Sequence, residues 1–210
     1  MPQDNAPVWF ITGCSTGFGR ELVTQVLGRG WRVVATACNP EPIRAVVEGH
    51  EDNTLILELD VNDREMVART VQVAEEKFGA IDVLVNNAGY GYLAAIEEGE
   101  DDEIRAQFET NVFGLIAVTQ AVLPGMRARK KGRIVNFSSI GGLVSFPATG
   151  YYHATKYAVE AKDTPLRLLL GKPALDLAYK KLETLKANFD AWAETTLSAD
   201  FPDAQQKNAI

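Results

Sequence analysis

The 210-residue sequence contains only two cysteines, Cys14 and Cys38. Two cysteines cannot form the disulfide framework of a small secreted protein, so a reducing compartment is expected. A basic surplus is also absent, because 21 Lys and Arg face 28 Asp and Glu, giving a net charge of −7. That balance argues against binding to a nucleic-acid backbone. The two histidines, His50 and His153, lie in no pattern typical of a metal site, so no metal is expected.

Long apolar runs are absent too. No stretch approaches the roughly 20 residues that span a membrane, and the first five residues lack the basic and apolar regions of a signal peptide. The composition, 46% hydrophobic and 23% charged, is close to that of an average globular protein. These features predict a single domain over residues 1–210, cytoplasmic and without nucleic-acid or membrane partners.

What the sequence does contain is an alternation of short apolar segments with segments of helical periodicity. This alternation predicts an α/β fold: a doubly wound, mostly parallel sheet of the Rossmann type, flanked by helices. Strands are expected at residues 8–12, 32–37, 54–59, 81–85, 133–137 and 166–170. Helices are expected at residues 18–27, 63–78, about 102–128, about 150–161 and about 173–192, the second capped by Asn62 with Glu65 as its capping-box partner. Ligands bind such sheets at the carboxyl ends of the strands.

A glycine-rich loop, Thr12-Gly13-Cys14-Ser15-Thr16-Gly17-Phe18-Gly19, follows the first predicted strand. Gly13 would permit a tight turn, Gly17 a close approach by a pyrophosphate, and Gly19 close helix packing. The helix that begins here would direct its positive end toward phosphates. The same glycines could also form an ordinary strand-to-helix turn, and position after the first strand favours phosphate binding.

Tyr152 and Lys156 are separated by four residues, which places them on one face of a helix. An ammonium group beside a phenol favours the phenolate and lowers a pKa that is ordinarily about 10. A tyrosine that exchanges protons near neutral pH needs such a shift.

Together these motifs resemble the short-chain dehydrogenase/reductase family. The resemblance extends from Val8 to Ala161 and rests on order and spacing. The matching segments are Thr12-Gly13-x-x-x-Gly17-x-Gly19, Leu59-Asp60-Val61, Asn86-Asn87-Ala88-Gly89, Asn111, Ser139 and Tyr152-x-x-x-Lys156. It implies an oxidoreductase that interconverts a secondary alcohol and a carbonyl. Tyr152 would be the acid/base, Lys156 would lower its pKa and bind the nicotinamide ribose, Ser139 would bind the substrate oxygen, and Asn111 would hold a water for proton relay.

The resemblance also implies a nicotinamide cofactor. Its contacts would be Gly13, Ser15, Thr16, Gly17, Phe18, Gly19, Cys38, Asp60, Val61, Asn87, Ala88 and Gly89, together with Tyr152 and Lys156. NAD sites usually place an acid at the end of the second strand. Here Thr36-Ala37-Cys38-Asn39-Pro40 contains none, which favours NADP(H) over NAD, with Arg20 and Arg44 as the nearest basic residues. A small-molecule substrate and a homo-oligomer through the Asn111 and Tyr152 helices are implied as well.

Some of these residues have a simpler interpretation. Ser138 and Ser139 could cap a turn, Asn111 could be a buried helix asparagine, Tyr151 could serve packing, and His153 could lie on the surface. The family pattern also breaks after Ala161, where the chain is shortened between about residues 161 and 165 relative to the family. Residues 166–170 would then take a sixth strand position or leave an exposed edge. Loss of the substrate lid would leave a catalytically weak nucleotide-binding or scaffold protein as the alternative function.

Overall fold

The computed structural model describes residues 6–158 and 172–198. The chain divides into two compact units, Met1–Ala161 and Lys162–Ile210, and each is described by itself. The first unit contains a five-stranded sheet in the order β3-β2-β1-β4-β5, and every neighbouring pair is parallel. The strands are β1 Val8–Ile11, β2 Arg32–Ala37, β3 Thr54–Glu58, β4 Val83–Asn86 and β5 Arg133–Asn136. The prediction of a doubly wound parallel sheet is confirmed, and these five strands lie within two residues of their expected positions.

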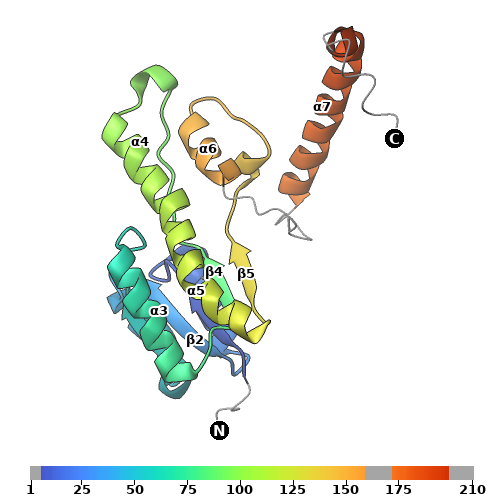
Figure 1. Ribbon diagram of the computed structural model, residues 1–210. Helices are drawn as coiled ribbons and strands as arrows, with labels where there is room; N and C mark the ends of the chain where they lie inside the picture. Colours follow the sequence, from blue (N-terminus) through green and yellow to red (C-terminus); the bar gives the residue numbers. More distant parts are fainter. Residues whose placement is uncertain (1–5, 159–171, 199–210) are drawn as a thin grey trace. The chain divides into compact units, whose positions relative to one another are not determined.

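Helices cover both faces of the sheet, and Figure 1 shows α3 and α5 side by side over one of them. On one face, the apolar side chains of α3 (Arg64–Phe78) and α5 (Leu115–Arg129) form one buried cluster with Phe10, Val34 and Leu84. On the other face, α1 (Gly17–Leu27) and α2 (Glu41–Val47) form a second cluster with residues of β1, β2 and β4. Since both faces are buried, the strands consist of nearly continuous apolar runs rather than alternating ones.

Two local details differ from expectation. The cap of α3 is Asp63, whose carboxylate accepts a hydrogen bond from the N–H of Met66 at 2.9 Å, so the assignment to Asn62 was one residue early. An Asp satisfies this position as well as an Asn does. The seven-residue helix α2 was not predicted, because it is too short to show a helical period.

The long helix expected at about 102–128 is interrupted. It consists of α4 (Asp101–Phe108), a π-helical turn at Glu109–Gly114, and α5. Asn111 lies within the π-helical turn and is 2% exposed. Single π-helical turns inside helices are frequent at functional sites.

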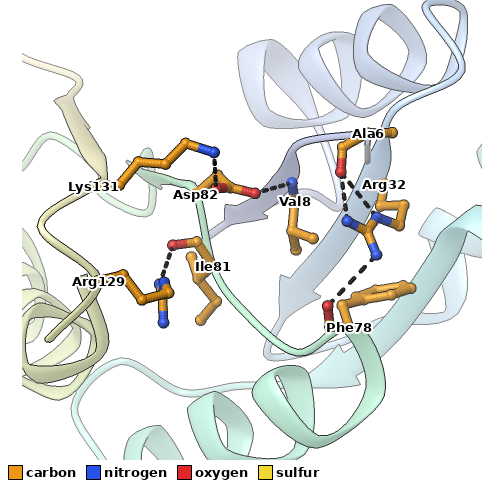
Figure 2. A network of polar contacts seen from close by, with 8 residues as sticks. All are labelled: Ala6, Val8, Arg32, Phe78, Ile81, Asp82, Arg129 and Lys131. Atoms are coloured by element: carbon orange, nitrogen blue, oxygen red, sulfur yellow. Dashed lines mark hydrogen bonds and ion pairs between the residues drawn. The ribbon is translucent and has the colours of Figure 1, made fainter. Parts of the chain in front are cut away.

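The amino-terminal end of the sheet is held by a polar network, shown in Figure 2. Asp82 accepts a hydrogen bond from the Val8 N–H at 3.0 Å and pairs with Lys131 at 3.1 Å. Arg32 donates to the carbonyl oxygens of Ala6 and Phe78. Arg129 donates in the same way to the Ile81 carbonyl. Charged side chains therefore satisfy backbone groups where the strands begin.

The second unit contains the helix α7, Lys172–Ser198, where a helix at about 173–192 was expected. The predicted sixth strand at residues 166–170 and the shortened segment at about 161–165 lie outside the described residues. The single-domain prediction therefore stays a prediction. Within the described ranges, no helix combines the length and apolarity that crossing a membrane would require.

Candidate active site

The glycine loop lies between β1 and α1 and packs against the turn after β4. Gly13 has φ +70°, and a Cβ added there would approach the Ala88 Cα to 2.9 Å. A Cβ on Gly19 would overlap the Gly13 carbonyl oxygen and the Asn87 amide. Gly17 has φ +56° and no atom within 4 Å of an added Cβ, so it faces open space. Packing thus requires Gly13 and Gly19 to lack side chains, while Gly17 leaves room for a ligand to approach the backbone.

The loop and the β4 turn are joined through Asn87. Its side-chain amide donates to the carbonyl oxygens of Thr12 and Gly13, each at 2.9 Å. In return, the Thr12 hydroxyl accepts from the N–H groups of Asn87 and Ala88, each at 3.0 Å. These four bonds fix two of the predicted cofactor-binding segments relative to each other.

The start of α1 contains the other predicted loop residues, Ser15, Thr16 and Phe18. Thr16 is the N-cap of α1 and makes no side-chain capping bond. Phe18 is 66% exposed, and its ring lies 5.7 Å from that of Phe137. The first N–H groups of a helix have no intrahelical acceptor, so this end of α1 offers donors and a positive dipole end to a phosphate.

Three predicted cofactor contacts, Cys38, Asp60 and Val61, follow β2 and β3. Cys38 is exposed, and partial burial followed by the charge of Asp60 raises the pKa of its thiol. The Asp60 carboxylate accepts from the Asn62 N–H at 2.9 Å. Val61 is only 6% exposed, and its side chain fills the space beside Gly114. Among the three, only Cys38 and Asp60 present side chains that a ligand could reach.

Asn111 binds the segment that follows Gly89. Its Nδ2 donates to the Tyr90 carbonyl at 2.7 Å and to the Thr155 hydroxyl at 3.2 Å, and its Oδ1 accepts from the Tyr90 N–H at 3.0 Å. A Cβ on Gly89 would lie 2.8 Å from that Oδ1. Asn111 is therefore a buried asparagine whose side chain donates two hydrogen bonds and accepts one, and it joins the β4 turn to the helix α6, Gly150–Ala158.

Tyr152 and Lys156 lie side by side on α6, as their spacing predicts. The Lys156 Nζ is 5.7 Å from the centroid of the Tyr152 ring and donates to the Phe137 carbonyl at 3.0 Å. Burial lowers the pKa of Lys156, because the charged ammonium is poorly solvated there. The site thus places a buried cation beside the phenol.

The hydroxyls of Ser138 and Ser139 both make local hydrogen bonds. The Ser139 Oγ accepts from the Gly141 N–H at 3.1 Å and caps the short helical turn Ile140–Gly142. The Ser138 Oγ donates to the Lys156 carbonyl at 3.0 Å. Because Ser139 acts as an acceptor in this cap, its own hydrogen can still be donated to another oxygen.

The two residues beside Tyr152 have different environments. The Tyr151 hydroxyl donates to the Ile96 carbonyl at 2.7 Å, so this side chain does pack, as expected. His153 is only 8% exposed, and its placement on the surface was wrong. It lies on the inner face of α6, edge-on to the Phe146 ring, where Gly141 leaves space for the imidazole.

Comparison with known proteins agrees with this geometry. A family model described as short chain dehydrogenase matches residues 7–172. The chain belongs to the short-chain dehydrogenase family.

Two relatives show how much of a family member the chain contains. It is 40% identical over 160 residues to "Oxidoreductase BOA17" of Botryotinia fuckeliana (strain B05.10), covering 76% of this chain and 58% of that protein. It is 37% identical over 158 residues to a 3-ketodihydrosphingosine reductase of Bacteroides thetaiotaomicron, covering 75% of this chain and 56% of that protein. The chain thus spans little more than half the length of these curated relatives.

Solved structures of short-chain dehydrogenases share the fold. One from Streptomyces avermitilis has a TM-score of 0.88 and 28% identity, covering 95% of this chain and all of that one. A gluconate 5-dehydrogenase from Burkholderia cenocepacia, in complex with NADP and tartrate, has a TM-score of 0.68 and 31% identity, covering 73% of this chain and 61% of that one.

Three residues of this short-chain dehydrogenase site have no role assigned by the sequence analysis. Thr12 and Thr155 form the hydrogen bonds that join β1, the β4 turn and α6. Gln107, four residues before Asn111, is completely buried, and its Oε1 accepts from the Tyr92 N–H at 2.6 Å. Gln107 and Asn111 therefore bind alternate residues of one extended segment, from successive turns of the helix. The i, i+4 spacing of Gln107 and Asn111 is visible in the sequence, but the sequence does not show that both residues bind the segment containing Tyr90 and Tyr92.

Proposed function

We propose that this short-chain dehydrogenase transfers a hydride between NADP(H) and a secondary alcohol or carbonyl substrate, with Tyr152 as the acid/base. The observation that carries this proposal is the buried Lys156 ammonium beside the Tyr152 ring, at the carboxyl end of the parallel sheet. Ligands bind at this end in doubly wound folds. Structural roles alone do not require a buried cation beside a phenol, because burying a charge is unfavourable.

The residues present fit a dinucleotide. Gly17 leaves open space over the loop backbone, and the first turn of α1 supplies free N–H donors for a pyrophosphate. Asp60, Ala88 and Gly89 would border the nucleoside, with Cys38 beside the ribose. When bound, the nicotinamide supplies the hydride chemistry.

A preference for NADP(H) is supported by the end of β2, where Ala37, Cys38 and Asn39 present no carboxylate to repel a 2′-phosphate. The nearby guanidinium groups differ in availability. Arg44 is paired with Glu41 at 3.0 Å, whereas Arg20 is exposed on α1. The phosphate-bearing cofactor of the Burkholderia dehydrogenase agrees with this choice. NAD is the alternative.

The catalytic residues would divide the work as follows. Tyr152 would exchange the proton with the substrate oxygen, and Ser139 would donate a hydrogen bond to that oxygen. Lys156 would hold its positive charge beside the phenol and bind the cofactor ribose. Asn111 would keep the β4 turn in place against α6 and hold the relay water.

A homo-oligomer through the Asn111 and Tyr152 helices forms part of this proposal. Phe113 and Ile116, beside Asn111, are 47% and 38% exposed. Exposed apolar side chains on neighbouring turns are common at subunit contacts. Light scattering of wild type and of Phe113→Glu should distinguish an oligomer from a monomer.

Cofactor binding and turnover test the proposal separately. Quenching of tryptophan fluorescence by NADPH and NADH measures binding and its preference. Oxidation of the bound cofactor by a panel of ketones, followed at its near-ultraviolet absorbance, measures turnover. Tyr152→Phe should lower turnover by about 10³-fold with binding unchanged, while Tyr151→Phe, the neighbouring control, should retain most of it. Equal turnover in Tyr152→Phe would contradict the mechanism, and binding without turnover would favour a nucleotide-binding or scaffold protein.

A further inference from the structure

The negative charge of this chain is concentrated beside the candidate active site. Residues 90–110 contain seven acidic side chains and one basic, a net charge of −6 within a chain of net charge −7. All seven acids are exposed: Glu97, Glu98, Glu100, Asp101, Asp102, Glu103 and Glu109. The one cation, Arg105, is already paired with Asp101 at 2.7 Å. The segment therefore carries an uncompensated negative field.

This acidic segment contacts the start of α6, where Tyr152 lies. The Ile96 carbonyl accepts a hydrogen bond from the Tyr151 hydroxyl at 2.7 Å. A Cβ added to Gly91 would lie 3.4 Å from the Tyr152 ring and 3.8 Å from Leu93. The segment therefore lies against the Tyr152 ring on this side.

Two apolar side chains of the acidic segment are exposed next to the start of α6. Leu93 and Ile96 are 60% and 69% exposed, and an Ile96 methyl lies within 3.4 Å of a Cβ built on Gly150. Phe146, in the segment before α6, is 41% exposed, and its ring lies edge-on to that of His153, the residue after Tyr152. Exposed apolar side chains gathered around one polar group are typical of a binding mouth.

Among the described residues around Tyr152, no cation is free to pair with an acidic substrate. Residues 140–155 contain no Asp, Glu, Lys or Arg. The following residue, Lys156, is buried, and its ammonium donates to the Phe137 carbonyl. One wall of the site is thus uncharged and the other is acidic within the described residues.

From this arrangement we infer that the substrate side selects uncharged, apolar carbonyl compounds and their alcohols, and repels carboxylated or phosphorylated ones. The inference rests on the proposed function, because it assigns the substrate class of the same site. Leu93, Ile96 and Phe146 supply the apolar contact, and the acidic segment supplies the repulsion. Selectivity of this kind combines an attractive element with a repulsive one.

Three ketones that share the acetophenone skeleton and are neutral, negative and positive test the inference: acetophenone, 4-acetylbenzoate and 4-acetyl-N,N,N-trimethylanilinium. With NADPH, kcat/KM for the carboxylate should be about tenfold or more below that for acetophenone. Raising the salt concentration should narrow this gap, because salt screens exposed charges. The triple variant Glu97→Gln, Glu98→Gln, Glu100→Gln should also narrow the difference in kcat/KM between acetophenone and the carboxylate, because it removes negative charge from the acidic segment. The matched control Glu48→Gln, Glu65→Gln, Glu76→Gln makes the same change in net charge elsewhere and should leave the gap intact.

A binding measurement separates this inference from the proposed function. Ligand-detected NMR on the full chain with NADPH reports binding of each ketone without turnover. If no ketone is reduced but acetophenone binds and the carboxylate does not, the substrate-class inference stands and the proposed catalysis fails. Carboxylate binding or turnover equal to that of acetophenone would overturn the inference. So would a failure of acetophenone to bind at any concentration up to its solubility.

Discussion

The two ends of the parallel sheet are built from different chemistry. At the amino-terminal end, the charged side chains of Arg32, Asp82 and Arg129 satisfy backbone groups (Figure 2). At the carboxyl end, neutral groups do this work, chiefly the Thr12 hydroxyl and the Asn87 amide. Lys156, the buried cation there, has a carbonyl partner and no carboxylate among the described residues. The first end pairs Asp82 with Lys131, whereas the second depends on shape around one buried cation.

The largest expected effect comes from shape at the carboxyl end. Gly19→Ala would drive a Cβ into the Gly13 carbonyl and the Asn87 amide. Neither can move without breaking the bonds between β1 and β4, so we expect a loss of about 3 kcal/mol in the free energy of unfolding. Urea denaturation measures it. Gly28→Ala, at the other end of the same helix, has its nearest atom at 3.3 Å and a helical φ, so it should lie within about 0.5 kcal/mol of wild type. Equal effects in the two variants would contradict the packing argument.

A smaller effect is expected from charge at the amino-terminal end. Partial burial tends to raise the pKa of Asp82, but the Val8 N–H, Lys131 and Arg129 outweigh it and lower the pKa. A carboxylate with a lowered pKa stabilises the fold above its unfolded pKa, and this contribution is lost as pH falls through the folded value. Asp82→Asn should therefore cost about 1 kcal/mol at pH 7, a modest value because Lys131 is largely exposed.

The pH dependence is the sharper test of Asp82. Denaturation at neutral pH and at pH values below about 3.9, the ordinary Asp pKa, should show the difference between wild type and Asp82→Asn closing in acid. Asp52→Asn, at an exposed position, should match wild type throughout. A difference that persists unchanged in acid would mean that the charge of Asp82 is not what stabilises this end.

The buried cation at the site should weaken folding. Because burial lowers the pKa of Lys156, the unfolded chain binds this proton more tightly than the folded one. Stability then rises as pH passes from the lowered folded value up to the unfolded pKa of about 10.4. Lys156→Met should raise the unfolding free energy at pH 7 by about 0.5–1 kcal/mol while removing turnover, although the Phe137 carbonyl loses its donor.

The extra stability of Lys156→Met should disappear above pH about 10.4, where the lysine of the wild type is neutral in both the folded and the unfolded chain. Thermal unfolding at several pH values measures it. Lys77→Met, at an exposed position on α3, is the control and should show no such pH dependence. A Lys156→Met variant that is less stable than wild type at pH 7 would show that the ammonium contributes to folding rather than opposing it.

Sequence patterns predicted the sheet well because each strand is a short apolar run between two helices. Such a run can be recognised from neighbouring residues alone. They also placed Tyr152 beside Lys156, since four residues make one turn of a helix. They did not show that Asn111 lies in a π-helical turn, because that turn depends on the bonds to Tyr90 and Thr155 from other elements.

Contacts between distant segments explain the other differences. His153 has no apolar neighbour in sequence that marks it as buried, and its environment comes from Phe146 and from the space at Gly141. The amino-terminal network joins Val8, Asp82 and Lys131, which belong to three separate segments. Which of these segments meet depends on the order of the strands in the sheet. A single sequence indicates that order only when it resembles a family whose fold is known.

Backbone strain is expected to have the smallest effect on the free energy of unfolding, and it can be tested at both the amino-terminal and the carboxyl end of the sheet. Within residues 6–158 and 172–198, two non-glycine residues have positive φ, Lys130 at +52° after α5 and Ala148 at +57° before α6. Replacing either with glycine removes the Cβ clash of the left-handed conformation, so each variant should gain about 0.5 kcal/mol in thermal or urea unfolding. Lys130→Gly changes the amino-terminal end and should leave kcat/KM unchanged. Ala148→Gly loosens the uncharged wall that holds Phe146 beside the site, so its kcat/KM for acetophenone should fall about threefold, as expected where strain serves pre-organisation. Equal kcat/KM in both variants would mean that the strain at Ala148 has no part in shaping the site.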